Sequence, residues 1–367
     1  MVRGDLLTAA DEQLNHQAPF PLRVPATTDH RFYDRHWFEA VDADQGVAAL
    51  IGLGVYKNMD VADGFLSVQH NGEQHNLRIS RPLGPDVSAT VGQLDIAVTK
   101  PFEQVSITLD DPALPVGCRL FWESSSRATL EDSHLEMRES RIIQHTSRYD
   151  QMGRLSGWVR VGRLLFESPR WWGIRDHSWG VRPDVGGFEA TTAPRSVGAL
   201  WQWLHAGVGD TLVHIQSRED GRGHLEWLEG FVRRGDVELR VVSFSHDLKF
   251  SERGREWVSL RHLLTLEDGS QVEVEADPIL RPWAYRGTGY ENGFADSRGV
   301  GVARGDLVEY DVLDISIPGR VTRDGEPYRP GHREQPARVL VDGDEGMGHA
   351  MVLAAGVVSR YGLGEGR

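Results

Sequence analysis

The sequence predicts an all-β protein made of antiparallel sheets, and three observations lead to this class. Short runs that alternate apolar and polar residues recur along the chain, as in "FLSVQHNGEQHNLRIS" at residues 65–80. Pairs that favour tight turns, such as Asn71-Gly72 and Asp268-Gly269, separate many of these runs. Long helical patterns between strands are missing, which argues against a parallel nucleotide-binding sheet. Closely spaced short strands of this kind are typical of a sandwich or a barrel.

The elements follow one another in a simple order. A short helix is expected near the N-terminus in "LLTAADEQLNHQ", residues 6–17, and strands are expected after it. "LSGWVRVGRLLFES" turns near Gly162, and "WLEGFVRRGDVELRVVSFS" turns at residues 234–236. "MGHAMVLAAGVVSRYGLG" then supplies a last strand near the C-terminus.

One segment divides the chain into two β-rich parts of comparable size. The stretch "TTAPRSVG", residues 191–198, is small and polar, and Pro194 within it cannot donate a ladder hydrogen bond. A length of 367 residues also suits two domains. We therefore expect an N-terminal domain over residues 1–193 and a C-terminal domain over residues 194–367.

Composition excludes several classes of function. The formal net charge of −14 offers no basic surface for nucleic acid. No window reaches the roughly 18 consecutive apolar residues that a membrane-spanning helix needs. The first residues lack an apolar stretch behind a basic start, and Cys118 is the only cysteine, so we expect a cytoplasmic protein without disulfides. Homodimerisation is left open by the sequence.

The segment "WWGIRDHSWGVRP", residues 171–183, concentrates aromatic side chains around an acid and an imidazole. On a strand, His177 and Trp179 share one face, whereas Asp176 points to the other. Trp201 and Trp203 are again two residues apart and so share a face. Two facing strands of this kind would line a pocket with indole rings and place a histidine among them.

Such a pocket suits a hydrophobic substrate and acid–base chemistry. An apolar setting raises the pKa of a carboxylic acid, so Asp176 would stay protonated and could protonate an alkene, while His177 relays the proton. Indole faces of Trp179, Trp201 and Trp203 would stabilise positive charge. A packed core with a hydrogen-bonded imidazole, and an ion pair between Arg175 and Asp176, explain the same residues. From the residues alone both interpretations stay open.

The motif "RDHSWGVR" resembles the signature of the hydroxyneurosporene synthase family, which comprises the carotenoid hydratases and lipocalin-like relatives such as the pyrroline-forming Diels–Alderases. Segments 37–73 and 287–314 are similar to that group at the level of pattern. The resemblance implies two lipocalin-like β-domains, a hydrophobic pocket and no cofactor. It also implies that His177 and Trp179 correspond to the family's His-x-Trp and Asp176 to the preceding acid. The Tyr that carotenoid hydratases carry further on has no counterpart in "LWQWLHAGVGD", residues 200–210.

Further residues are candidates for substrate binding or for a metal. "RPWAYRGTGY" offers Trp283 and Tyr285 at strand spacing, and Tyr290 as a phenol that could act as an acid. Arg182 could meet a polar end of the substrate. His205 and His214 could join His177 in a three-histidine metal site, although their spacing matches no tight ligand motif, and we expect no metal.

Two functions remain on these grounds. The first is a cofactor-independent lyase or isomerase, of the hydratase, dehydratase or cyclase type, that acts on a terpenoid, polyketide or aromatic alkene. Its catalytic residues would be Asp176, His177 and Trp179. The second is a lipocalin-like carrier that binds a hydrophobic small molecule without transforming it. The acid beside the imidazole favours the enzyme, because a carrier has no use for a pair that transfers protons.

Overall fold

The computed structural model describes residues 11, 14, 16, 18–85, 87–138, 140–183, 185–187, 198–252 and 255–364. Over this part of the chain nearly all regular structure is antiparallel β-strand, which confirms the fold class expected from the sequence. Its helical segments are short 3₁₀ turns. The helix expected near residues 6–17 lies largely outside the described residues, and so do residues 191–197 of the expected linker.

The chain forms two compact units. The first unit comprises Met1–His70, Gln74–Thr192 and Arg286–Val312, and the second comprises Asn71–Glu73, Ala193–Tyr285 and Leu313–Arg367. A later stretch of the chain, Arg286–Val312, thus returns to the first unit after most of the second unit's strands.

The elements have the following bounds. The strands of the first unit are β1 (Phe32–Asp42), β2 (Val47–Tyr56), β3 (Val61–His70), β4 (Glu73–Pro82), β5 (Thr90–Val91), β6 (Leu94–Lys100), β7 (Gln104–Leu109), β8 (Val116–Ser124), β9 (Thr129–Leu130), β10 (His134–Arg138), β11 (Arg141–Val161), β12 (Leu164–Val181) and most of β19 (Leu307–Asp314). The strands of the second unit are β13 (Ala199–Val208), β14 (Thr211–Asp220), β15 (Leu225–Arg234), β16 (Val237–Phe250), β17 (Trp257–Leu266), β18 (Gln271–Pro278), β20 (Thr322–Arg323), β21 (Glu326–Pro327), β22 (Glu334–Val341) and β23 (Asp344–Ala355). The 3₁₀ turns are η3 (Lys57–Met59), η4 (Tyr285–Thr288), η5 (Tyr290–Asn292) and η6 (Ser359–Tyr361).

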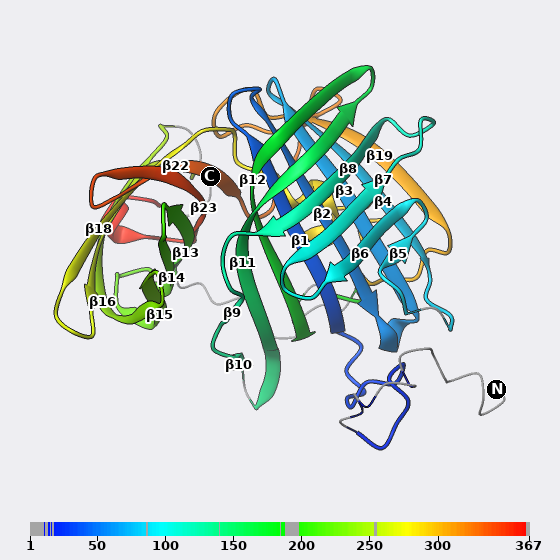
Figure 1. Ribbon diagram of the computed structural model, residues 1–367, viewed down its shortest axis with the longest axis horizontal. Coiled ribbons are helices and arrows are strands. Elements are labelled where there is room, and N and C mark those ends of the chain that lie inside the picture. The colour runs from blue at the N-terminus through cyan, green and yellow to red at the C-terminus, as the bar shows by residue number, and fades with distance from the viewer. Residues whose placement is uncertain are drawn as a thin grey trace. The chain divides into compact units, whose positions relative to one another are not determined.

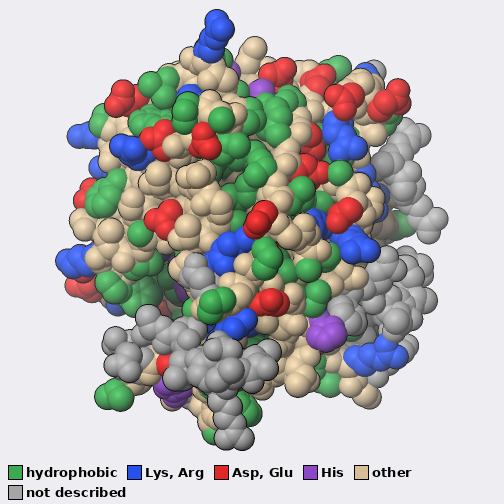
Figure 2. All heavy atoms as spheres, turned by 90° about the vertical axis from the view of Figure 1, so that its right-hand side faces the viewer, with side chains coloured by type: hydrophobic (Ala, Val, Ile, Leu, Met, Phe, Trp, Pro, Cys, Tyr) green, Lys and Arg blue, Asp and Glu red, His purple; other side chains and the backbone are tan. Residues whose placement is uncertain are grey.

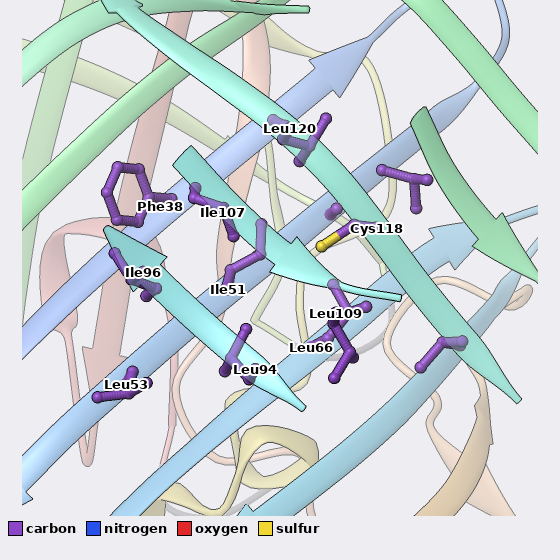
Figure 3. Close-up of a cluster of buried hydrophobic side chains, with 14 of the residues drawn as sticks. Phe38, Ile51, Leu53, Leu66, Leu94, Ile96, Ile107, Leu109, Cys118 and Leu120 are labelled. Atoms are coloured by element: carbon purple, nitrogen blue, oxygen red, sulfur yellow. The ribbon is translucent and has the colours of Figure 1, made fainter. Parts of the chain in front are cut away.

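The first unit is one large antiparallel sheet that folds over on itself (Figure 1). Its strand order is β19-β4-β3-β2-β1-β12-β11-β8-β7-β6-β5, and β9 and β10 pair with β11 beside this path. β3 contacts β5 and β8, which lie far from it along the sheet. Figure 3 shows the resulting core, in which Phe38, Ile51 and Leu66 of β1–β3 face Ile107 and Leu120 of β7 and β8. Burial of these apolar side chains stabilises the fold-over.

The second unit is a closed antiparallel barrel with the order β13-β14-β15-β16-β17-β18-β22-β23. β13 closes it by pairing with β14 on one side and β23 on the other. Apolar side chains that alternate along these strands fill its core, among them Leu204, Ile215, Leu264 and Val274. Closure leaves no strand edge in the barrel exposed for pairing with another chain.

The turns expected from the sequence are present. Asn71 and Gly72 join β3 to β4 with φ of 51° and 79°, the positive values that a type I′ turn requires. Gly162, Gly235 and Gly269 also have positive φ, and they lie in the β11–β12, β15–β16 and β17–β18 connections. Local turn chemistry therefore places these hairpins correctly.

Figure 2 shows one face of the molecule. On the face that Figure 2 shows, acidic and basic side chains are scattered among apolar and neutral ones. No helix formed by the described residues has the length and apolar character needed to cross a membrane.

Candidate active site

Three neighbouring strands of the first unit bring a carboxylate, an imidazole and a phenol to one face of the sheet. β12 pairs with β1 and with β11, and the register sets His177 opposite both His36 and Tyr149. Asp34 lies two residues before His36 on β1 and therefore shares its face. Phe38, two residues after His36, belongs to the apolar core. This face is thus the inner side of the folded sheet.

Hydrogen bonds join the three groups. His177 donates from Nε2 to Asp34 Oδ1 at 2.7 Å, and the Tyr149 hydroxyl donates to His177 Nδ1 at 3.3 Å. An ionised carboxylate only accepts, so Asp34 keeps the imidazole proton on Nε2 and leaves Nδ1 as an acceptor. The side chains of His177 and Asp34 are 26% and 44% exposed. Solvent can therefore reach the pair.

The environment sets the charges of this trio. Partial burial opposes ionisation of Asp34, but the hydrogen bond from His177, and the positive charge that this ring carries when protonated, hold the pKa of the carboxyl below its usual range. Burial raises the pKa of the Tyr149 phenol, and the neighbouring Arg175 only partly offsets this. At neutral pH the carboxylate is therefore charged and the phenol keeps its proton.

Aromatic rings surround the imidazole. The ring centroids of His36, Tyr149 and Trp179 lie 4.3, 5.4 and 5.5 Å from that of His177. Burial, followed by the charge of His177, lowers the pKa of His36 to about 3, so His36 is neutral near pH 7. His177 and Trp179 share one face, as their spacing on a strand predicts.

Asp176 is not the carboxylate that contacts His177. It lies on the opposite face of β12, at the register positions of Trp37 and Asp150. The contacting carboxylate is Asp34, 143 residues earlier in the chain. Strand spacing in "FYDRHWFEA" places Asp34 and His36 on one face, but only the pairing of β1 with β12 shows which face His177 meets. The suggested ion pair between Arg175 and Asp176 is wrong for the same reason, since neighbouring residues of a strand point to opposite faces.

Two predicted binding residues come together elsewhere in the first unit. The Arg182 guanidinium lies 5.1 Å from the ring centre of Tyr290 and 5.8 Å from that of Tyr33. Tyr290, in η5, also faces the Arg35 guanidinium at 4.6 Å and is 8% exposed. Tyr33 and Asp176 share the outer face of the β1–β12 pair. Arg182 and Tyr290 thus lie near the face that carries Asp176 rather than the face that carries His177.

The predicted tryptophans of the second unit lie on β13. Trp201 and Trp203 share a face of this strand, as expected, and His205 continues it. The ring of Trp203 lies 4.6 Å from that of His205 and 5.3 Å from that of His349. Trp203 is 4% exposed, so it is packed among aromatic and imidazole rings.

The expectation that Trp283 and Tyr285 share the face of a strand is wrong. The strand β18 ends at Pro278, and Tyr285 begins the 3₁₀ turn η4. Pro282, which has no N–H, directly precedes Trp283 and interrupts any ladder there. The Tyr285 hydroxyl instead donates to Glu334, which also accepts a hydrogen bond from His349 Nε2 at 3.0 Å. Tyr285 is thus part of a buried polar network.

Of the three histidines considered as metal ligands, His177 lies in the first unit, and His205 and His214 lie in the second. His205 Nε2 and His214 Nδ1 lie 2.8 Å apart and hydrogen-bond to each other within the second unit. Both ring nitrogens of His177, in the first unit, are hydrogen-bonded to Asp34 and Tyr149. Neither ring nitrogen of His177 therefore presents a lone pair to a metal in this arrangement.

A second acid–imidazole–phenol arrangement lies inside the barrel of the second unit. His246 contacts Glu219 through Nε2 at 2.6 Å and the Tyr361 hydroxyl through Nδ1 at 2.7 Å. His246 and Glu219 are only 4% and 5% exposed. Its chemistry resembles that of the Asp34–His177–Tyr149 trio, but its burial marks it as structural. Access is what makes the trio of the first unit the candidate active site.

Comparison with solved structures agrees with the fold. A protein provisionally named AttH (NE1406) from Nitrosomonas europaea aligns with 93% of this chain and 98% of its own, with a TM-score of 0.53 and 13% identity. Kievitone hydratase from Nectria haematococca aligns with 90% of this chain and 92% of its own, with a TM-score of 0.47 and 11% identity. CghA, solved with Sch210972, aligns with 88% of each chain, with a TM-score of 0.42 and 10% identity. At these identities the likeness to the first protein concerns the fold alone.

Comparison at the level of sequence identifies the family without an activity. No curated protein matches the chain. One family model matches residues 7–310, which is most of the sequence and includes the Asp34–His177–Tyr149 trio. The chain therefore belongs to this family, which is described as a family of unknown function (DUF8625).

Proposed function

We propose that this protein is an acid–base catalyst, a lyase or isomerase of the hydratase, dehydratase or cyclase type, that acts on a hydrophobic small molecule. One observation carries the proposal: a partly exposed imidazole is held between a charged carboxylate and a protonated phenol. The resemblance of "RDHSWGVR" to the carotenoid hydratases supports the same class. The substrate classes that we favour are terpenoids, polyketides and aromatic alkenes.

The trio would act as a proton relay in either direction. When a substrate C–H or O–H is deprotonated, the Tyr149 oxygen takes the proton while its own proton passes to His177 Nδ1. Asp34 stabilises the imidazolium that results, as a carboxylate does in other relays of this type. In the reverse direction the imidazolium returns its proton to Tyr149, whose own proton forms a new C–H bond on an alkene. Hydration is completed when water attacks the neighbouring cationic carbon and loses a proton to the relay.

The aromatic surroundings suit this chemistry. Trp179 presents an indole 5.5 Å from the imidazole ring, and an indole face attracts positive charge by about 0.5–2 kcal/mol. It would therefore stabilise a cationic carbon more than the neutral alkene, which is the difference that lowers a barrier. Asp34 and Tyr149 take the catalytic place that the sequence suggested for Asp176, which lies on the opposite face of β12.

Deuterium exchange tests the proposal even while the product is unidentified. The full-length protein would be incubated in D₂O with a panel of terpenoid, polyketide and aromatic alkenes, and incorporation would be followed by mass spectrometry. We expect an exchanging alkene whose rate falls about 10²–10⁴-fold in Tyr149→Phe and His177→Asn. His224→Asn is a matched control, because His224 forms an exposed pair with Asp220 outside the trio, and it should leave the rate unchanged.

The carrier function is the alternative outcome of this experiment. An alkene that binds tightly but acquires no deuterium from the wild-type protein would favour a carrier. Exchange that continues at the wild-type rate in both trio variants would contradict the proposed relay.

A further inference from the structure

The first unit holds a buried guanidinium, that of Arg175, that has no acidic partner among the residues that the structure describes. Arg175 lies on β12 two residues before His177, on the same face, and is 1% exposed. Its Nε and Nη2 donate to a single acceptor, Gln151 Oε1, at 2.9 and 2.6 Å. Among the described residues it forms no ion pair, and its Nη1 donates no hydrogen bond.

The amide that holds Arg175 is itself fixed in orientation. Gln151 Nε2 donates to the carbonyl oxygens of Phe102 and Ser126 at 2.6 and 2.7 Å. Both donors of this amide are thus used, and its oxygen must face the guanidinium. The direction of the Arg175 side chain is therefore set in advance by groups that carry no charge.

Aromatic rings form the rest of its surroundings. The guanidinium carbon lies 5.9 Å from the ring centre of Phe38, 5.7 Å from that of Trp122 and 5.5 Å from that of Tyr149. Ring faces attract a cation, but they supply no negative charge and accept no strong hydrogen bond. Burial lowers the pKa of Arg175, as expected for a cation that is removed from water and has no carboxylate beside it among the described residues.

Another buried arginine of the first unit, Arg78, is held by two carboxylates. Arg78 donates to the carboxylates of Glu309 and Asp311 at 2.9 and 2.8 Å. Proteins pair a buried charge because removing it from water is costly. Arg175 departs from this rule. It also lies beside the proposed relay, because the ring of Tyr149 is 5.5 Å from its guanidinium and 5.4 Å from the ring of His177.

We infer that Arg175 binds an anionic oxygen of the ligand, so that the substrate class is an apolar or aromatic carboxylate. This inference rests on the proposed function, because it places the acid group of the substrate beside the relay. Gln151 orients the guanidinium for this contact, and the rings of Phe38, Trp122 and Tyr149 accommodate the apolar part that adjoins the carboxylate. A carboxylate bound here would supply the counter-charge that the protein omits.

The test compares a carboxylate with its neutral amide on the full-length protein. Isothermal titration calorimetry would measure binding of trans-cinnamate against trans-cinnamamide, and of benzoate against benzamide. We expect the wild-type protein to prefer the carboxylate at least tenfold in one of these pairs. Arg175→Met should remove the preference, whereas Arg119→Met should retain it, because Arg119 is exposed and paired with Asp110.

Two further variants keep the outcome decisive. If Arg175→Met does not fold, Gln151→Glu introduces an internal carboxylate next to the guanidinium and should abolish the preference equally. His177→Asn should stop deuterium exchange but leave the preference intact. Equal binding of both members of each pair, binding of neither, or a preference that survives Arg175→Met and Gln151→Glu would overturn the inference. An Arg175-dependent preference without any exchange would instead contradict the proposed catalysis alone.

Discussion

We expect that replacing Gly180, the last residue of the "RDHSWG" motif, with any larger residue lowers the stability of the protein. Its φ is +129°, a region that residues with a side chain rarely adopt. A Cβ atom at this position would lie 2.2 Å from the carbonyl oxygen of His145 and 2.9 Å from the Cα of Thr146. Both atoms belong to the backbone of β11, which pairs with β12 here, so they cannot move without disturbing the ladder beside His177.

The matched control is Gly162, which joins the same two strands at their other end. It also has positive φ, +55°, but a Cβ there would meet no atom within 4 Å. Backbone strain should cost each alanine variant about 1–2 kcal/mol. The clash at Gly180 should add about 1–3 kcal/mol, as overpacking does in cores. We therefore expect a loss of about 2–5 kcal/mol for Gly180→Ala and about 1–2 kcal/mol for Gly162→Ala.

Urea unfolding followed by tryptophan fluorescence would measure both changes from the midpoint and the slope. A Gly180→Ala protein that is no less stable than Gly162→Ala would refute this reasoning. Equal losses would mean that β11 accommodates a methyl group without cost.

Three further predictions concern buried groups. His246→Asn should lower the free energy of unfolding by about 3–5 kcal/mol, because it leaves Glu219 buried and unpaired. His177→Asn removes a more exposed pair and should change the free energy of unfolding by at most about 1 kcal/mol. Similar losses for the two variants in urea unfolding would contradict this prediction. Burial lowers the pKa of His262 to about 3, so the unfolded chain binds more protons below pH 6.5 and stability falls as the pH decreases. This group should cost about 2 kcal/mol between pH 7 and pH 5, and His262→Gln should show a shallower loss in thermal unfolding than the wild type; an unchanged slope would speak against it. Burial raises the pKa of the Cys118 thiol to about 12, so DTNB should label it only as fast as the protein unfolds, and rapid labelling of the native protein would contradict this.

The parts of the fold that depend on local patterns could be predicted from the sequence. Alternation along β12 places His177 and Trp179 on one face, and the turn at Asn71-Gly72 follows from the positive φ that these residues tolerate. Both depend only on residues close together in the chain. The antiparallel all-β class follows from many such local signals.

The partner of His177 could not be predicted in this way. Asp34 meets the imidazole only because β1 pairs with β12 in one register, and a shift of one residue would present Tyr33 or Arg35 instead. The strand expected around Trp283 and Tyr285 failed because apolar spacing alone does not weigh the neighbouring Pro282. The alternation of apolar and polar residues reports neither contacts between distant segments nor the effect of a single proline on a strand.

The return of Arg286–Val312 to the first unit constrains how this protein can be divided in the laboratory. A fragment that stops near residue 193 would lack β19, so β4 would become an open sheet edge that invites aggregation. The same cut would remove Glu309 and Asp311, the two acidic partners of Arg78, and would leave the buried guanidinium without a counter-charge from these residues. Separate expression of the N-terminal half should therefore give insoluble material unless residues 286–312 are supplied with it, for example by a linker that joins them directly after residue 192.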